Sequence, residues 1–486
     1  MKKDLISLGL TRLAMFLMTL LSLPIIIRGL GDENYGLYVL IFGLINILTG
    51  FSNLGLGFTA MRGLPSCKES GHREELFYPQ FFMHISIGLF LGLLVYMLGT
   101  YSKYGQFFIE SDVSLWLISL YIMSYPLYMQ LNLLFKFTQA VPKLNFINIL
   151  LPATYLASLG IYFFLYQEIT INDMFKSHLI SVLFTVFLGL IASCKIINFK
   201  AIFYNWNEFI FDLRHGVPLI IASVLDQVMS LADRYILSFY LPLESVGYYV
   251  LASTVASMVV MVPKVFTLVS QPLVSKLIDL KRLDDVSSKV NKLSIIWLAI
   301  VIPSIVGSYL LGGQMIGIYI STSMGKSAGP IVWILMIGIS FLGLFFTYNV
   351  ILFALSKTDL LLKISLLTAI TNVVLNFTLL YIDTSLEMAA LATSLSYGLA
   401  FFITYSYCKN FLYLQPDFNE IYKIIISALM AGVSVFISMF TITAEIGLIE
   451  VLLLISQYIF FYILILILFN SKLTKFKLLK KTWKAL

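Results

Sequence analysis

Long apolar runs separated by short polar breaks fill nearly the whole sequence. A helix that crosses a bilayer needs roughly 20 apolar residues, and grouping the runs predicts fourteen such helices. A composition of 59% hydrophobic and 12% charged residues excludes a water-soluble protein. The sequence therefore predicts an all-α integral membrane protein. Its predicted spans are 10–27, 35–60, 77–100, 113–135, 145–166, 174–194, 217–240, 247–268, 293–313, 328–352, 360–382, 388–407, 424–443 and 448–469.

The basic residues indicate how the chain is oriented, because cytoplasmic loops accumulate Lys and Arg. Most of the 32 basic residues fall outside the predicted helices, in every second connecting segment counted from the N-terminus, and the C-terminal segment belongs to this set. Both termini are therefore predicted to be cytoplasmic. The net charge of +7 is explained by this topology, so it does not indicate a nucleic-acid partner and we expect none. The outer loops hold few cations, namely Arg28, Lys103, Lys176 and Lys326. The three cysteines, Cys67, Cys194 and Cys408, fall at inner helix ends, where a reducing compartment requires no disulfide.

Two segments of the chain resemble each other. LGDENYGLYVL (residues 30–40) and LPLESVGYYVL (residues 241–251) share residues at one constant offset, so that Tyr38 recurs as Tyr249. An even number of predicted helices separates the copies, which predicts two lobes inserted in parallel. The predicted organisation is a six-helix lobe (1–195), an amphipathic cytoplasmic linker (196–216), a second six-helix lobe (217–410), and two further helices with a basic tail (411–486).

A polar stripe runs along the predicted span 217–240. Ser223, Asp226, Ser230 and Asp233 are spaced three, four and three residues apart, which places them on one helix face. Hydrocarbon offers such groups no partners, so the stripe must face protein or a water-filled cavity. Asp226 has no cation nearby in sequence, whereas Asp233 could form a compensated pair with Arg234.

The repeat extends this polar face to the first lobe, where Ser223 corresponds to Arg12. Two parallel lobes with matching polar faces predict a solvated cavity between them. The cations Arg12, Arg62 and Lys264 would line its cytoplasmic side. The alternative for each is a long side chain that reaches the membrane interface without any function.

The sequence contains no complete motif for catalysis or cofactor binding. The string Met324-Gly325-Lys326-Ser327 resembles the end of a P-loop, but Ile320 stands where the first glycine should be. The histidines show no metal-ligand spacing with cysteines or carboxylates. We therefore expect no catalytic residue, no metal site and no cofactor, so the protein is not predicted to be an enzyme.

Three stretches carry a family resemblance: ISLGLTRLAMFLMTLLSLPIIIRGLGDENYGLYVL, GFSNLGLGFTAMRG and ADRYILSFYLPLESVGYYVLAS. They resemble Wzx-type polysaccharide flippases, members of the multidrug/oligosaccharidyl-lipid/polysaccharide exporter superfamily, which also holds the lipid II flippase. The resemblance implies alternating access in a bacterial inner membrane. The substrate would be an undecaprenyl-diphosphate-linked oligosaccharide, carried to the periplasmic leaflet for O-antigen or capsule synthesis, with polysaccharide polymerase machinery as a partner.

The resemblance also implies roles for residues. In the similar lipid II flippase, cations on the first, second and eighth helices bind the diphosphate, and Arg12, Arg62 and Lys264 match in helix. Lys264 replaces an arginine, and Arg62 lies closer to the interface. That relative has a sodium site, which implies Na⁺ or H⁺ coupling here, with Asn376 in place of a second carboxylate. The implied ion-coupling residues are Asp226, Asp233, Asn372, Asn376 and Thr393, and counting along the helices places Asp233, Asn376 and Thr393 at similar depth. The alternative for Asn372 and Asn376 is helix packing.

Other functional classes stay open at this point. A multidrug exporter of the same superfamily would favour an anionic lining for amphipathic cations. An O-antigen polymerase would have many spans and a large outer loop, and no such loop is predicted. A passive channel or a scaffold would not need a two-lobed repeat.

Overall fold

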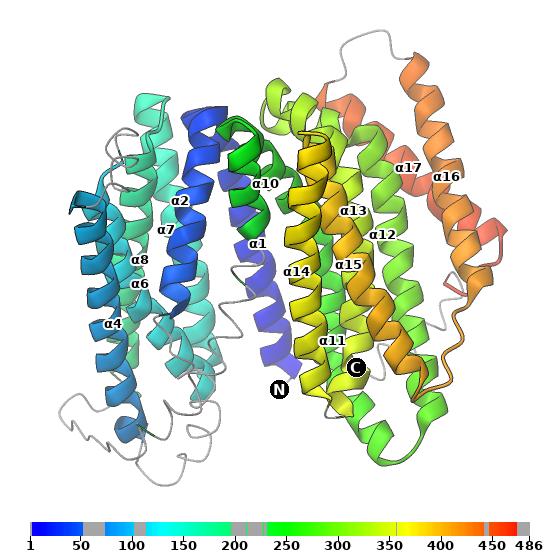
Figure 1. Cartoon of the computed structure of the whole chain (residues 1–486), viewed down its shortest axis with the longest axis horizontal. Coiled ribbons are helices and arrows are strands. Elements are labelled where there is room, and N and C mark those ends of the chain that lie inside the picture. The colour runs from blue at the N-terminus through cyan, green and yellow to red at the C-terminus, as the bar shows by residue number, and fades with distance from the viewer. Residues whose placement is uncertain are drawn as a thin grey trace. The chain divides into compact units, whose positions relative to one another are not determined.

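The structure, a computed structural model, describes residues 2–51, 73–101, 113–194, 231–355, 357–441 and 447–473, together with the single residues 196, 210 and 227. All regular structure in these ranges is helical. The chain divides into two compact units, Met1–Leu231 and Ala232–Leu486, and Figure 1 shows the helices of each. The division falls inside the predicted span 217–240. Of the predicted linker 196–216, only residues 196 and 210 are described.

Unit 1 is built from six described helices. They are α1 (Lys2–Leu30), α2 (Asp32–Phe51), α4 (Arg73–Tyr101), α6 (Leu115–Phe137), α7 (Val141–Tyr166) and α8 (Ile171–Ser193). The last of these begins with a capping box, in which Thr170 and Asp173 each accept a hydrogen bond from the other's backbone N–H. Cys194, the residue that follows α8, is an exposed free thiol.

The helical segment 231–240 crosses the boundary, so unit 2 begins with helical residues 232–240. The helices that follow are α10 (Leu243–Ser257), the 3₁₀ turn η3 (Met258–Val260), α11 (Met261–Asp279), α12 (Leu283–Tyr319), α13 (Thr322–Ala354), α14 (Thr358–Ile382), α15 (Leu386–Lys409), α16 (Phe418–Thr441) and α17 (Leu448–Leu468). Cys408 is buried as a free thiol near the end of α15. Cys67 lies outside the described residues.

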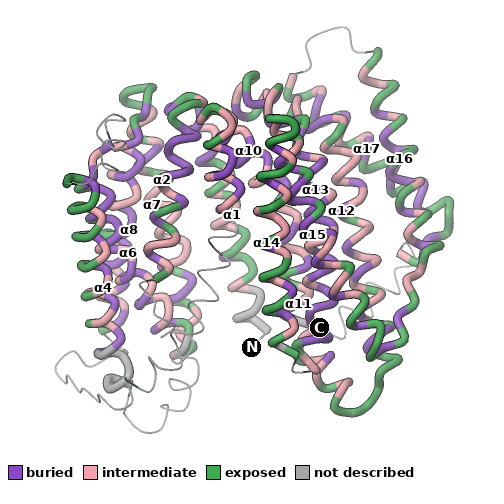
Figure 2. The backbone as a smooth tube through the Cα atoms, viewed as in Figure 1, coloured by how far each residue is buried: buried purple, intermediate pink, exposed green. Residues whose placement is uncertain are grey.

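Twelve helical segments among the described residues are long and apolar enough to cross a membrane. The predicted all-α, multi-pass membrane fold is thereby confirmed. Figure 2 shows exposed and buried residues alternating around these helices. On α16, Ala428 and Ala431 are buried whereas Val433 and Phe440 are exposed. The exposed face is as apolar as the buried one, which is expected of a helix whose outer surface contacts lipid.

The two units share a pattern of helix contacts. In unit 1, α6 packs against α2, α4 and α8, and α8 also packs against α7. In unit 2, α13 packs against α10, α11, α12 and α15, and α15 also packs against α14. The helices correspond in order, so each unit places its fourth and sixth helices at the centre.

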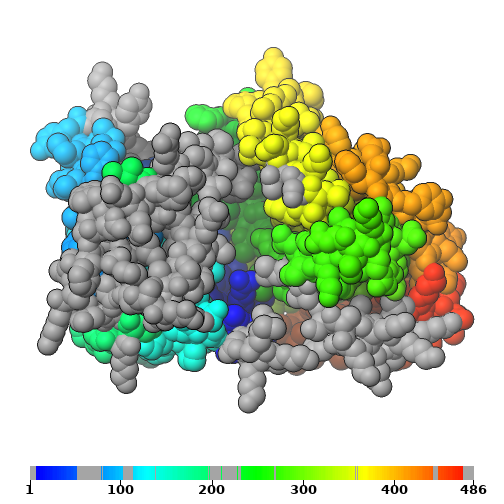
Figure 3. All heavy atoms as spheres, turned by 90° about the horizontal axis from the view of Figure 1, so that it is seen from below, coloured from blue at the N-terminus to red at the C-terminus, as the bar shows by residue number. Residues whose placement is uncertain are grey.

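Of the described helices, α12 extends furthest beyond its predicted span. The span was expected at 293–313, but α12 runs from Leu283 to Tyr319. Its polar beginning is helical because Val286 and Val290 recur one turn apart and pack into an apolar cluster with Ile364 and Leu412. Seen from the end where α12 begins, the α11–α12 turn forms part of the surface of unit 2 (Figure 3). Lys276, Lys281 and Arg282 are exposed there, at the end predicted to be cytoplasmic.

Candidate functional site

Asp233 lies in the helical segment 231–240 and is buried, with 8% of its surface exposed. Its carboxylate accepts hydrogen bonds from three neutral groups. The Asn376 Nδ2 donates to Oδ1 at 2.9 Å, the Thr393 hydroxyl donates to Oδ2 at 2.9 Å, and the Tyr249 hydroxyl donates to Oδ2 at 3.0 Å. Hydrogen bonds to an ionised acceptor are roughly twice as strong as neutral ones. The site is therefore built to hold a buried negative charge.

The donors come from three different helices. Asn372 and Asn376 lie one turn apart on the same face of α14, Thr393 lies on α15 and Tyr249 on α10. The Asn376 Nδ2 also reaches the Asn372 carbonyl at 3.0 Å and its Oδ1 at 3.3 Å, and the Asn372 Nδ2 reaches the Thr393 Oγ1 at 3.4 Å. We call Asp233, Tyr249, Asn372, Asn376 and Thr393 the Asp233 cluster. It connects four helices of unit 2.

One atom of the cluster has no hydrogen-bond partner among the described residues. The Asn376 side chain is fully buried, and its Oδ1 is unpaired. A buried unpaired carbonyl costs about 1–3 kcal/mol. Rotating the amide would turn Oδ1 toward the Asp233 carboxylate, where two oxygens repel each other unless a cation lies between them.

The oxygen atoms of the cluster fit a small hard cation. Such ions prefer carboxylate, carbonyl and hydroxyl oxygens, and the cluster offers these from Asp233, Thr393 and the amides of Asn372 and Asn376. The same carboxylate could instead take up a proton. Either ion would neutralise the charge and change the hydrogen bonds that connect the four helices.

The structure brings together four of the residues singled out from the sequence: Asp233, Asn372, Asn376 and Thr393. Asp226 and Arg62 lie outside the described residues. Arg12, on α1, and Lys264, on α11, are exposed. The Lys264 Nζ lies 5.8 Å from the centroid of the Phe346 ring, a distance at which the ring face attracts a cation.

Tyr249 was not predicted to belong to a site. The signal that could have identified it is the internal repeat, in which Tyr249 corresponds to Tyr38. In unit 1 the Tyr38 hydroxyl hydrogen-bonds the Nε2 of His178 on α8 at 2.8 Å. The His178 ring stacks on Phe42 at 4.7 Å and on Tyr155 at 4.1 Å, measured between ring centroids. In unit 2 the Tyr249 hydroxyl likewise lies 2.9 Å from the Thr393 Oγ1 on α15, so each unit uses the tyrosine of its second helix to contact its sixth helix.

Comparison with solved structures shows which fold this is. The lipid II flippase MurJ in an inward closed conformation superposes with a TM-score of 0.71 at 17% identity, covering 97% of this chain and 99% of that one. An inward-facing MATE-family multidrug resistance transporter of the MOP superfamily gives 0.63 at 11% identity, covering 81% of this chain and 94% of that one. An outward-facing MATE transporter gives 0.57 at 12% identity, covering 84% and 95%. The chain thus has the fold of these proteins.

Sequence comparison gives the family. A search of curated proteins finds no match. The profile of the polysaccharide biosynthesis protein family matches residues 1–278, which include all of unit 1 and the start of unit 2 through α11. This match covers more than half of the chain and includes Asp233 and Tyr249. The chain therefore belongs to the polysaccharide biosynthesis protein family.

Proposed function

We propose that this protein is an ion-coupled flippase for a polyprenyl-diphosphate-linked oligosaccharide. By alternating access it would carry the lipid-linked sugar from the cytoplasmic to the outer leaflet of a bacterial cytoplasmic membrane for polysaccharide assembly. Family membership supports a role in polysaccharide biosynthesis. The fold, shared with a lipid II flippase and with multidrug transporters, supports transport.

The observation that carries the proposal is the Asp233 cluster. A carboxylate buried in a membrane-spanning unit is costly and is typically functional. Here it accepts hydrogen bonds from Asn376 and Thr393, and rotation of the Asn376 amide would turn its unpaired Oδ1 toward a cation bound at Asp233. Binding of Na⁺ or H⁺ would neutralise Asp233 and loosen its hydrogen bonds to α10, α14 and α15. The relative stability of two arrangements of these helices would then depend on the ion.

The substrate assignment uses the exposed cations of the two units. Arg12 and Lys264 offer charge-assisted hydrogen bonds to a diphosphate as it leaves water. Moving two negative charges outward across a membrane that is negative inside gains about 4.6 kcal/mol per 100 mV, at ~2.3 kcal/mol per charge. The loaded step is therefore favoured by the potential alone. We assign the coupling ion to the return of the empty carrier.

The test is transport by the purified full chain in lipid vesicles. The probe is a fluorescent undecaprenyl-diphosphate trisaccharide, and its transfer between leaflets is followed while the membrane potential is clamped. Sodium and proton gradients are then varied separately. We expect one of the two gradients to raise the transport rate, and Asp233→Asn to remove this response.

The matched control is Asp173→Asn, because Asp173 forms an ion pair with Lys176 at the start of α8, in the other unit. This variant should keep the parental response. A parent protein that ignores both gradients would overturn the proposal. So would an Asp233→Asn variant whose response equals that of the parent.

A further inference from the structure

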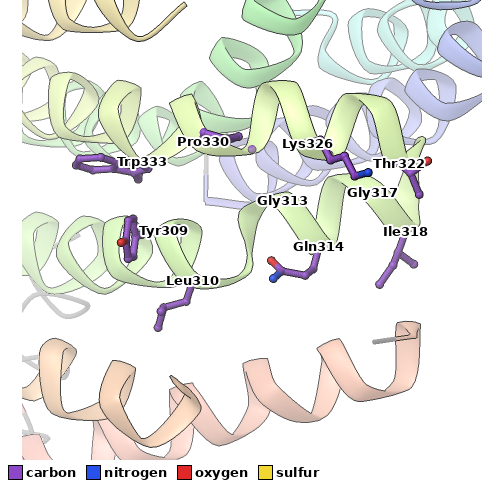
Figure 4. A pocket seen from close by; sticks show the side chains of 12 residues that line it. Tyr309, Leu310, Gly313, Gln314, Gly317, Ile318, Thr322, Lys326, Pro330 and Trp333 are labelled. Carbon is purple, nitrogen blue, oxygen red and sulfur yellow. The ribbon is translucent and has the colours of Figure 1, made fainter. Parts of the chain in front are cut away.

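A cavity of about 890 Å³ lies between α12 and α13, and no residue of the Asp233 cluster lines it. Figure 4 shows its lining side chains, with Tyr309 and Trp333 at one end and Ile318 and Thr322 at the other. Lys326 lies between these ends. None of the residues that line the cavity in the described chain carries a carboxylate.

Glycines form the floor of this cavity. A Cβ on Gly325 would lie 2.5 Å from the Gly313 carbonyl oxygen, and a Cβ on Gly329 would lie 2.5 Å from the Gly313 Cα. The backbones of α12 and α13 therefore touch directly, as small residues allow in membrane helices. Because no side chain covers them, a groove remains along the two helices. We call it the α12–α13 groove.

The groove changes from polar to aromatic along its length. Thr322, Gln314 and Lys326 lie toward the α12–α13 turn, which the charge distribution predicts to be at the outer face. The Tyr309 and Trp333 rings meet edge to face at 5.6 Å. At a rise of 1.5 Å per residue, Trp333 lies about 10 Å deeper than Lys326 and about 16 Å deeper than the first residue of α13. This is about half of the ~30 Å hydrocarbon core, so the groove spans one leaflet.

We propose that the α12–α13 groove binds one anionic glycerophospholipid of the outer leaflet. Its phosphodiester would contact the Lys326 ammonium, with Gln314 and Thr322 as neutral hydrogen-bond donors. One acyl chain would lie on the glycine floor and end at Tyr309 and Trp333. A phosphodiester carries a single negative charge, which matches the one cation of the lining, whereas a polyprenyl diphosphate would bring more charge than Lys326 can balance. This inference is independent of the transported substrate.

The test uses the position of Trp333 as a probe. The full chain is placed in vesicles of phosphatidylcholine and phosphatidylglycerol in which one or the other lipid carries brominated chains, and tryptophan quenching is measured. Subtracting the signal of Trp333→Phe isolates this residue. We expect brominated phosphatidylglycerol to quench Trp333 about fivefold more effectively at equal mole fraction, the ratio for ~1 kcal/mol per lysine near a lipid surface. The preference should vanish in Lys326→Gln.

Two controls separate charge from shape. Lys176→Gln removes a cation in unit 1 and should keep the preference. Gly317→Leu places a large side chain in the groove at a position where a Cβ meets nothing closer than 3.9 Å, and it should reduce quenching by both lipids. Its control is Gly160→Leu, at a helical glycine with open space around it.

Three results would overturn the inference. Equal quenching by the two lipids in the parent would mean that the groove holds any acyl chain. A preference that survives Lys326→Gln would place the anion elsewhere. Displacement of brominated phosphatidylglycerol by an equimolar amount of undecaprenyl phosphate would assign the groove to the carrier lipid instead.

Discussion

Two glycines in the contact between α12 and α13 should respond differently to replacement by alanine. A Cβ on Gly329 would lie 2.5 Å from the Gly313 Cα and 2.9 Å from its nitrogen, so the helix backbones must separate. A Cβ on Gly312 would meet the Gly329 carbonyl oxygen at 3.8 Å, an ordinary contact. Overpacking costs about 1–3 kcal/mol. We expect the upper part of this range for Gly329→Ala, because both clashing groups are backbone and cannot rotate away.

The comparison isolates the steric cost. Both glycines lie in helix interiors, so each alanine gains roughly the same ~1 kcal/mol of helix propensity, and this gain cancels in the difference. Gly312→Ala should therefore be as stable as the parent or more so. Gly329→Ala should be less stable than Gly312→Ala by about 1–3 kcal/mol. The measurement is the apparent melting temperature of each purified variant in one detergent, and a Gly329→Ala protein that melts at or above Gly312→Ala would refute the close contact.

Three further changes test other parts of the structure. Tyr249→Phe removes one hydrogen bond to the ionised Asp233 carboxylate, and such a bond contributes about 1.5–3 kcal/mol. The half-saturating concentration of the coupling cation should therefore fall by roughly tenfold or more. A rise in this concentration would instead mean that the Tyr249 phenol oxygen is an ion ligand. Lys264→Ala should slow transport of the diphosphate probe, and Lys264→Arg should keep the parental transport rate. Equal transport rates in the parent and both variants would show that Lys264 has no role in binding. The hydrogen bond from Lys472 lowers the pKa of Asp417, so the stabilisation is complete above the ordinary carboxyl value of about 3.9 and is lost as pH falls through the lowered pKa. The difference in melting temperature between the parent and Asp417→Asn should accordingly be constant from about pH 7 to 5 and shrink as pH falls below about 3.9, and a difference that grows as pH falls below this value would contradict the prediction.

The geometry of the Asp233 cluster was partly predictable from the sequence. Straight helices rise uniformly, so counting residues from the membrane faces placed Asp233, Asn376 and Thr393 at one depth. The structure joins them with hydrogen bonds. Counting residues from the membrane face did not identify Tyr249, because a tyrosine hydroxyl lies far from its Cα. The depth of the Tyr249 backbone therefore does not give the depth of its polar atom. The unpaired Asn376 Oδ1 could not be predicted at all, since amide orientation depends on neighbours from three helices.

Helix ends and helix contacts were less predictable. The polar sequence at the start of α12 predicts a loop. The structure shows a helix there, because the few apolar residues of this stretch are spaced to pack on one side. The α12–α13 groove depends on which glycines of two helices face each other, and a single sequence does not give that register. The sequence spacing of the histidines argues against a metal site and gives no other role for His178. In the structure it is a stacking and hydrogen-bonding partner of aromatic residues.

The repeat supplies the same scaffold twice, but the chemistry built on it differs. Tyr38 hydrogen-bonds a histidine in unit 1, whereas Tyr249 hydrogen-bonds a carboxylate in unit 2. The position equivalent to Asp233 is Ser22, whose hydroxyl donates to the Thr19 carbonyl within its own helix. A cation that binds at Asp233 thus changes hydrogen bonds between helices, while the equivalent side chain of unit 1 makes a bond that is local. Under the proposed mechanism, ion binding at Asp233 therefore acts on the packing of unit 2, where the hydrogen bonds of this carboxylate join its helix to α10, α14 and α15.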